Sequence, residues 1–292
     1  MSDTMRDTIR IPKSDGALQQ AAAKPPAATP AKPSRPASAA RADGAQSPQA
    51  AIGWAILGAV ALVVLWEGIV RLLSLPAYIL PKVSDILVAV FTQREALFAA
   101  AQMTVMEALS GFALGTMAGV SLAVVMTMIP AVRRVMLPAA IAINSVPVVA
   151  YAPLVLLWCG IGPQSKIVMV TLAVGFTIFL SALAGLNQID QRAVNLMRSF
   201  GGNRFSVLWR LRIPAALPLI AAGMRVSTVR SMIVAIVTEM LGATGGLGWT
   251  IFQAVLQIDF VQVWSAIFVA SAASMIFFGA VGYAERKIVY WK

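Results

Sequence analysis

The sequence predicts an all-α polytopic membrane protein. Of its 292 residues, 59% are hydrophobic and only 12% are charged, and the mean hydropathy is +0.80. A single soluble core could not bury that much apolar surface. The apolar residues also gather into runs that reach or exceed the roughly 20 residues an α-helix needs to cross a bilayer. The six predicted spans cover residues 52–73, 97–129, 135–158, 167–186, 217–241 and 261–283.

The first 50 residues contain no apolar run, so they are not expected to be a secretory signal peptide. Ala, Pro and Ser dominate residues 21–49, a composition that cannot bury enough surface to fold. We therefore expect residues 1–50 to form a disordered cytoplasmic tail and residues 51–292 to form one transmembrane domain. The tail is either a solvated leader or a contact for anionic lipid head groups.

The distribution of Lys and Arg predicts the orientation in the membrane. Seventeen of them lie in the tail, after the second and fourth spans, or after the last span. The opposite side carries only Lys82, Arg94 and Lys166. The positive-inside rule then places both termini in the cytoplasm, together with the loop at 187–216, which we call the basic loop. Because topology explains the net charge of +11, no nucleic-acid partner is predicted.

The residue types that most enzymes and metal sites require are scarce. The sequence has no histidine and a single cysteine, Cys159, which lies in an apolar run. Histidine relays, histidine metal sites and cysteine zinc sites are therefore excluded, and we predict no catalytic residues and no metal. The glycine-rich stretch GATGGLGW (242–249) lacks the Lys-Ser/Thr ending of a phosphate-binding loop. We interpret it as a tight turn or re-entrant backbone at the outer mouth of the domain.

Two prolines, Pro147 and Pro153, lie within the third predicted span. Each removes a backbone donor and crowds the preceding turn, so we expect the helix to bend or break near them. A broken helix can line a solute path, and a proline kink between packed helices explains the pattern equally well. Both interpretations stay open at this point.

Charged residues inside the spans predict internal partners. On insertion scales an arginine near the centre of a span costs about 2.5–3.5 kcal/mol, so Arg225 and Arg230 should face protein or water. Glu107 lies at a depth comparable to that of Arg230, in a span that runs in the opposite direction. We hypothesise that Glu107 and Arg230 pair, or that Arg230 faces the path as a counter-charge for an anionic solute. Glu67 and Arg71, four residues apart, are expected to form a local pair.

The basic loop combines arginines with an amphipathic pattern of helical period. We expect two short helices, separated by Gly201-Gly202 and ended by Pro214. Their apolar stripes consist of Val194, Met197 and Phe200 or Gly201 in the first helix, and of Phe205, Leu208 and Trp209 in the second. Such helices can rest on lipid, or can insert their apolar faces into a groove on a soluble cytoplasmic partner.

At these residues the chain resembles the permease subunits of bacterial ATP-binding-cassette (ABC) importers. Their cytoplasmic loop follows the pattern E-A-A, three residues, G, nine residues, I-x-L-P. Here Gly201 is followed by nine residues, 202–210, and then by L-R-I-P at 211–214. The resemblance covers residues 52–291 and is greatest to the branch that imports nitrate, taurine and alkanesulfonates, bicarbonate or pyrimidine precursors. Supporting segments are GFALGTMAGVSLAVVM (111–126), VPVVAYAPLVLLWCGIGPQSKI (146–167), IPAALPLIAAGMRVS (213–227) and TEMLGATGGLGWTI (238–251).

The resemblance implies a type I ABC importer permease fold, located in the bacterial inner membrane among lipid and without a cofactor or catalysis of its own. Two cytoplasmic ATPase subunits would hydrolyse ATP, and a second permease copy would complete the translocation path. A periplasmic solute-binding protein would deliver the solute near 242–249. Arg225 and Arg230 favour a small anion such as a sulfonate, nitrate or a carboxylate.

The same resemblance implies which residues function. The residues implied to contact the ATPase are Asn195, Phe200, Gly201, Phe205, Trp209 and Pro214. The charges and prolines within the spans, and not the resemblance, give the candidates for the path or for buried charge, which are Glu107, Arg225, Arg230, Pro147 and Pro153. Asn195-Leu196-Met197 replaces the family's Glu-Ala-Ala, so a carboxylate contact to the ATPase is missing.

Glu107 stands where relatives often carry a basic residue, and Arg230 stands where an apolar residue is expected. The two differences are either a compensating exchange or a means of solute selection. Two other functions remain alternatives. An ion-coupled secondary transporter would use Glu107, and a membrane scaffold would bind anionic lipid through the basic loop.

Overall fold

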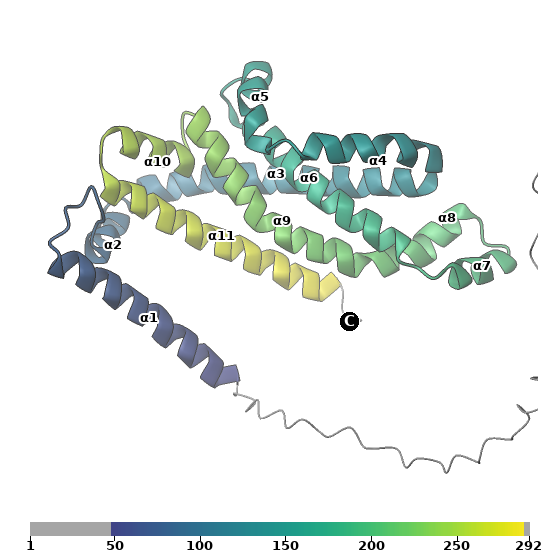
Figure 1. Ribbon diagram of the computed structural model, residues 1–292, viewed down its shortest axis with the longest axis horizontal. Coiled ribbons are helices and arrows are strands. Elements are labelled where there is room, and N and C mark those ends of the chain that lie inside the picture. The colour runs from purple at the N-terminus through teal and green to yellow at the C-terminus, as the bar shows by residue number, and fades with distance from the viewer. Residues whose placement is uncertain (1–47, 289–292) are drawn as a thin grey trace, which may run out of the picture. The chain divides into compact units, whose positions relative to one another are not determined.

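The computed structural model describes residues 48–288, which form helices joined by turns and loops and contain no strand (Figure 1). Residues 56–288 pack as one compact unit. The predicted disordered tail lies outside the described residues, except for residues 48–50, which begin α1. The α-helices are α1 (Pro48–Leu72), α2 (Val83–Thr92), α3 (Arg94–Met128), α4 (Pro130–Asn144), α5 (Ala152–Cys159), α6 (Pro163–Asn187), α7 (Gln191–Ser199), α8 (Arg204–Val207), α9 (Ile213–Leu241), α10 (Leu247–Leu256) and α11 (Phe260–Ile288). A 3-10 helix, η1 (Val148–Tyr151), precedes α5, and a π-helix, η2 (Leu208–Arg212), joins α8 to α9.

Within the described residues, four helices are long and apolar enough to cross a membrane: α3, α6, the run Arg204–Leu241, and α11. They correspond to the second, fourth, fifth and sixth predicted spans, which are thereby confirmed as helices. The first predicted span corresponds to α1, a helix of 25 residues whose side chains are described only in part.

The third predicted span is a helix pair rather than one straight helix. α4 and the segment Val148–Cys159 meet at an angle of 87°. The bend lies at Pro147, whose φ of −54° and ψ of 127° are those of an extended residue. Pro153 lies in the first turn of α5, where a missing N–H breaks no helical hydrogen bond. The expected break is therefore found at Pro147 and not at Pro153.

Glycines hold α3 and α6 in direct backbone contact. Gly111, Gly115 and Gly119 follow one another at four-residue spacing along α3 and face α6. A Cβ at Gly115 would lie 2.9 Å from the Thr171 carbonyl oxygen, and a Cβ at Gly119 would overlap the Gly175 carbonyl. Small residues at this spacing let two membrane helices approach closely, which dispersion forces then stabilise.

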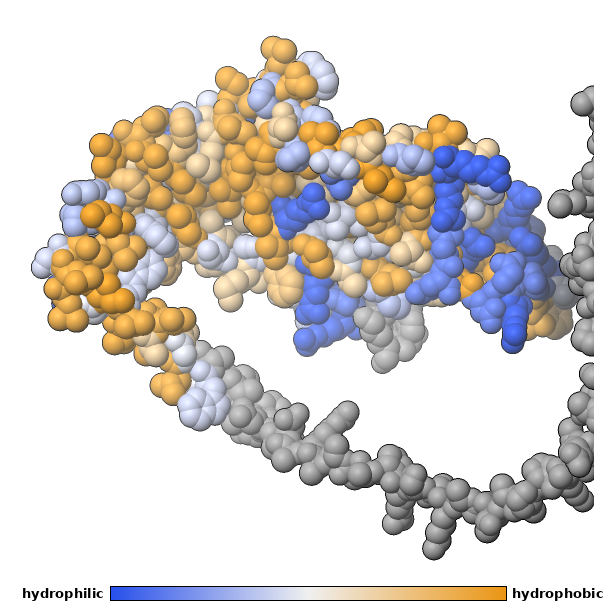
Figure 2. Space-filling model, in the orientation of Figure 1, coloured by the Kyte–Doolittle hydropathy of each residue, from blue (hydrophilic) through white to orange (hydrophobic). Residues whose placement is uncertain are grey.

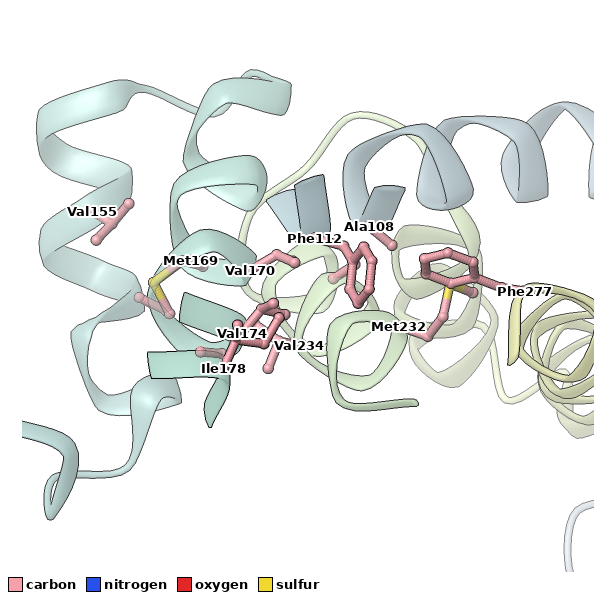
Figure 3. Close-up of a cluster of buried hydrophobic side chains, with 13 residues drawn as sticks. Ala108, Phe112, Val155, Met169, Val170, Val174, Ile178, Met232, Val234 and Phe277 are labelled. Carbon is pink, nitrogen blue, oxygen red and sulfur yellow. The ribbon is translucent and has the colours of Figure 1, made fainter. Parts of the chain in front are cut away.

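The hydrophobic core lies where α3, α6, α9 and α11 meet. Figure 3 shows side chains from all four helices interdigitating there. Phe112 of α3 and Phe277 of α11 stack edge to face, with ring centroids 5.4 Å apart. The other labelled members are Ala108, Val155, Met169, Val170, Val174, Ile178, Met232 and Val234. This packing fixes α9 between α6 and α11 along much of its length (Figure 1).

Trp66 and Glu67 join the end of α1 to the helices beside it. The Trp66 indole N–H donates to the Pro81 carbonyl at 3.2 Å, and its ring lies 4.8 Å from that of Trp264 on α11. Glu67 pairs with Arg71 at 2.7 Å, as predicted. Glu67 also accepts a hydrogen bond from the Ser84 hydroxyl at 2.9 Å, which ties α1 to the first turn of α2.

Candidate functional site: a basic elbow and a buried charge cluster

The first half of the basic loop is α7, a short helix with a cap at each end. The Asp190 side chain accepts a hydrogen bond from the Arg192 N–H at 2.9 Å and caps the N-terminus. At the other end Gly201 has a φ of +81°, and the Gly202 N–H donates to the Met197 carbonyl at 3.0 Å. A left-handed residue at this place favours glycine, so the predicted helix stop is confirmed.

The second half of the basic loop continues directly into the membrane helix. Asn203 caps α8 by accepting from the Ser206 N–H at 2.8 Å, and the run Arg204–Leu241 is then a single helix of 38 residues. The expectation that Pro214 ends the helix is wrong, because Pro214 lies in the first turn of α9. The π-helix η2, where the Ile213 N–H donates to the Leu208 carbonyl, widens the helix directly before the proline ring and makes room for it.

The loop carries large apolar side chains on its outer side. The side chains of Phe200, Phe205 and Trp209 are exposed by 84%, 67% and 66%, although Leu208 beside them is 3% exposed and packs into the core. Arginines are exposed around these apolar residues at positions 192, 198, 204 and 210. Figure 2 shows strongly hydrophilic side chains gathered at the end of the molecule that bears α7 and α8. We call the exposed residues of 191–210 the elbow surface.

Of the predicted ATPase-contact residues, some lie on the exposed surface of this loop and one lies behind it. Asn195 is exposed on α7, where its side chain accepts a hydrogen bond from Gln191 at 3.2 Å. Asn195 and the three aromatic residues belong to the elbow surface, and Gly201 forms the turn between its two halves. Pro214 is only half-exposed and belongs to the helix behind that surface. Exposed aromatic and arginine side chains are typical of protein interfaces.

The hypothesised pair between Glu107 and Arg230 is not formed. Arg230 donates to the Thr177 hydroxyl at 3.0 Å, and within the described residues it makes no ion pair. Glu107 instead lies beside Glu239 and Lys166. The error arose because equal depth in two helices does not specify which faces meet.

Arg225, the third charged candidate, connects α9 to the end of α11. Its guanidinium lies 3.8 Å from a carboxylate oxygen of Glu285 and 5.1 Å from the ring centroid of Phe278. The site is part of the packing between these two helices. Arg225 therefore has an acidic partner within the chain, whereas Arg230 has none among residues 48–288.

A second group of polar and charged side chains lies at the opposite end of α9 from the elbow. It comprises Thr104 and Glu107 of α3, Lys166 of α6 and Glu239 of α9, and we call it the turn-anchoring cluster. Glu107 is 2% exposed, and the other three are fully buried.

The cluster holds the glycine-rich turn between α9 and α10. Glu239 accepts hydrogen bonds from the Thr104 hydroxyl at 2.8 Å and from the Gly248 N–H at 2.7 Å. The Leu247 N–H donates to the Thr104 hydroxyl at 2.8 Å. A Cβ at Gly246, which has a φ of +95°, would collide with the Glu239 carboxylate. The turn is therefore built around that carboxylate, whose negative charge also suits the N-terminal end of α10.

Sequence analysis missed Lys166 and Glu239 as site residues. Lys166 was counted as a loop charge, but it lies in the first turn of α6 and donates to the carbonyls of Ile161, Gly162 and Gly242. The available signal was a glutamate inside an apolar span three residues before a glycine-rich turn. A carboxylate in such a place needs donors, and a turn that exposes N–H groups supplies them.

A cavity of about 330 Å³ lies between α3, α4 and α6. The bend at Pro147 turns η1 back over α4, where the Tyr151 hydroxyl donates to the Ile143 carbonyl at 3.0 Å and forms part of the wall. The lining contains no charged residue, so neither Arg225 nor Arg230 faces it. Its larger side chains are Met126, Met136, Asn144, Tyr151, Phe176 and Phe179.

Comparison with known proteins agrees with this architecture. Residues 111–290 match the family model described as "Binding-protein-dependent transport system inner membrane component". A "Probable ABC transporter permease protein" of Haemophilus influenzae is 29% identical over 229 residues, which are 78% of this chain and 94% of that protein. The "Taurine transport system permease protein TauC" of Escherichia coli is 35% identical over 136 residues, which are 47% of this chain and 50% of that protein.

A solved structure shares the fold. An inward-facing structure of the MetNI methionine ABC transporter superposes with a TM-score of 0.55 at 18% sequence identity, covering 69% of this chain and 98% of that chain. At this identity the likeness concerns the fold alone. The family match extends over more than half of the sequence and includes the elbow, α9 and the glycine-rich turn. The chain therefore belongs to the family of inner membrane components of binding-protein-dependent transport systems.

Proposed function

We propose that the chain is the permease subunit of an ABC importer and forms the translocation path for a small solute. Two ATPase subunits bind the elbow surface from the cytoplasm, a second permease copy completes the path, and a periplasmic binding protein delivers the solute. The protein lies in the bacterial inner membrane with both termini in the cytoplasm. The names of the relatives and the distribution of basic residues support this assignment.

The observation that carries the proposal is the unbroken helix Arg204–Leu241. Its first residues belong to the elbow surface, and its last residues reach the glycine-rich turn at the other end of the domain. A displacement of the elbow by an ATPase is transmitted along this helix, because its helical hydrogen bonding continues from the elbow to the turn. The close contacts of α9 with α6 then move the two helices together.

Absence of the family glutamate changes how the ATPase is bound. Asn195 can supply an amide but no carboxylate to the partner. We therefore assign most of the contact to Phe200, Phe205 and Trp209, whose exposed rings would fill an apolar socket. The surrounding arginines suit an acidic rim around that socket.

The solute is proposed to be a small anion such as a sulfonate, nitrate or a carboxylate. Arg230 is half-buried in a membrane helix and hydrogen-bonds to the neutral Thr177, so an anion would compensate its charge. The relatives include permeases named for taurine, aliphatic sulfonates and formylaminopyrimidine.

The assignment to an importer is tested by co-purification with the cognate ATPase. Trp209→Asp places a charge in the centre of the elbow surface, and we expect the ATPase to be lost while the permease stays in the membrane. Thr244→Asp adds the same charge at an exposed position in the glycine-rich turn, and is the matched control that should retain the ATPase. Normal solute-stimulated ATP hydrolysis by the Trp209→Asp complex would contradict the proposal.

The preference for an anion is tested separately in proteoliposomes with one fixed binding protein. Arg230→Gln should lower uptake of the anion and leave ATPase binding unchanged, because Arg230 lies far along α9 from the elbow. Thr177→Val is the control that removes the hydrogen bond and keeps the charge. Equal loss in both variants would show that Arg230 acts through packing and not through charge.

A further inference from the structure

The turn-anchoring cluster buries two carboxyl groups, those of Glu107 and Glu239, and one ammonium group, that of Lys166. We propose that Glu107 is a proton-binding site: its carboxyl group is protonated and donates a hydrogen bond to the Glu239 carboxylate, which fastens the glycine-rich turn to α3. The inference rests on the hydrogen bonds within the cluster and is independent of the proposed transport cycle.

Glu239 has the environment of an ionised carboxylate. It accepts from the Thr104 hydroxyl at 2.8 Å and from the Gly248 N–H at 2.7 Å, and it lies at the N-terminal end of α10. A protonated Glu239 would place its own donor among these donors. The negative charge of the cluster therefore resides on Glu239.

Lys166 supplies the positive charge and has no hydrogen left for Glu107. Its ammonium group carries three hydrogens, and it donates to three backbone carbonyls, those of Ile161, Gly162 and Gly242. Glu239 and Lys166 together are electrically neutral. An ionised Glu107 would add a full charge that no described group compensates.

Glu107 is the member of the cluster that accepts no hydrogen bond from another described group. It is 2% exposed, and neither of its carboxyl oxygens receives a hydrogen bond from another group of the described chain. Glu107 lies one helical turn after Thr104 on α3, and Thr104 donates to Glu239, so the two carboxyl groups are neighbours. Two neighbouring carboxylates repel each other, whereas a carboxyl and a carboxylate form a short, strong hydrogen bond. One proton on Glu107 therefore satisfies both side chains.

The charged surroundings of Glu107 are complete within the described residues. α6 presents Lys166 to it and α9 presents Glu239, while α5 and α10 contain no acidic or basic residue. The polar side chain of α3 in the cluster is Thr104, which already donates to Glu239. A proton is the ligand that fits, since it adds a donor and removes the excess charge without requiring further oxygen ligands.

The proton has a mechanical consequence for the turn. Lys166 holds the start of the turn through the Gly242 carbonyl, and Glu239 holds its end through the Gly248 N–H. Glu107 is the additional link from this assembly to α3. While the proton is present, the turn, α3, α6 and α9 are fastened at one point, and loss of the proton would set two carboxylates against each other beneath the turn.

Infrared spectroscopy of the full-length protein in lipid nanodiscs tests the protonation directly. At neutral pH we expect a carbonyl stretch of a protonated carboxyl group in the wild type and its loss in Glu107→Gln. The glutamine at 107 keeps the shape and the donor but has no titratable proton. The inference is overturned if Glu107→Gln leaves the band unchanged.

Cysteine accessibility tests the fastening of the turn. Ala243 is 4% exposed, and Cys159 is the single native cysteine, so Ala243→Cys in a Cys159→Ser background reports opening of the turn. Adding Glu107→Leu should accelerate thiol labelling by about tenfold or more, because the link to Glu239 is lost. Adding Glu107→Gln should leave the rate within about twofold, because the amide replaces the donor.

Both outcomes of the labelling experiment are decisive. Equal acceleration by glutamine and by leucine would show that a donor at position 107 is not what holds the turn. No acceleration by leucine would show that Glu107 does not fasten it. If Glu107→Leu does not assemble in the membrane, the comparison of the wild type with Glu107→Gln by infrared spectroscopy still decides the protonation.

Discussion

The two ends of the helix that begins in the elbow and ends at the glycine-rich turn are opposite in character. At the elbow, aromatic side chains are mostly exposed, as Trp209 and Phe200 illustrate. At the turn, Glu239 and Lys166 are fully buried. Aromatic side chains are usually buried and charged side chains are usually exposed, so each end of the helix reverses the usual preference. Under the proposed function, the partners of the elbow lie in another chain, whereas those of the buried charges lie within this one.

The opposite arrangements have different energetic consequences. Exposed aromatic groups contribute little to folding and become favourable when a partner covers them. Buried charges are costly unless each is paired and hydrogen-bonded, so the turn-anchoring cluster contributes to a unique arrangement of α3, α6 and α9. Changes at the turn should therefore affect stability, and changes at the elbow surface should affect association.

The largest effect is expected from Lys166→Met, which removes the only cation of the turn-anchoring cluster. It leaves the Glu239 charge buried and three carbonyls without a donor, at a cost of about 3–5 kcal/mol in the free energy of unfolding. Thermal unfolding of the purified protein in detergent measures this loss. Lys82→Met, at an exposed position, is the control and should change stability by less than about 0.5 kcal/mol. Similar melting temperatures for the two variants would show that the buried cluster contributes no more to stability than an exposed lysine does.

The next largest effects are expected at two adjacent positions, Leu208 on the buried face of the elbow and Trp209 on its exposed face. Leu208→Ala removes a core side chain and should destabilise the protein by about 2–5 kcal/mol. Trp209→Ala should leave the melting temperature nearly unchanged and weaken ATPase binding by about 2 kcal/mol or more, which is roughly thirtyfold. Titration of the purified permease with the ATPase measures the second effect. A Trp209→Ala protein that binds the ATPase normally would refute the role of the exposed face.

A smaller effect is expected at the turn of the elbow. Gly201 has a φ of +81° and open space around it, so Gly201→Ala tests backbone strain alone. We expect a loss of about 1 kcal/mol in stability. Gly58→Ala, in a helix and equally unobstructed, is the control and should not destabilise. If Gly201→Ala melts like the wild type, the α7–α8 turn is not fixed in its left-handed form.

The smallest effect is expected from Pro214→Ala. Because the helix already passes through this position, loss of the ring should change stability by less than about 0.5 kcal/mol and should leave uptake intact. A helix that ended at Pro214 would instead change its course when the proline is removed. Uptake in proteoliposomes and thermal unfolding together measure this, and a large loss of uptake would show that the ring itself sets the direction of the elbow.

Much of the fold follows from the sequence because the relevant forces are local. Apolar runs long enough to cross a bilayer predict α3, α6 and α11 whatever lies beside them. The stop at Gly201-Gly202 follows from the φ that glycine permits. These features depend on neighbours within about two turns of the same helix. The predicted apolar stripes of the elbow are wrong in part, because Val194 and Leu208 are buried whereas Phe200, Phe205 and Trp209 are exposed.

The tertiary structure alone decided the partners of the charged residues. Glu107 could have faced Arg230 or Lys166 as far as depth in the membrane is concerned, and the glycine contacts between α3 and α6 set the rotation that brings it to Lys166 and Glu239. Likewise, Pro214 alone predicts a helix end, and the π-helix before it removes the clash. Burial of a charge is a property of several helices at once, so no single stretch of sequence specifies it.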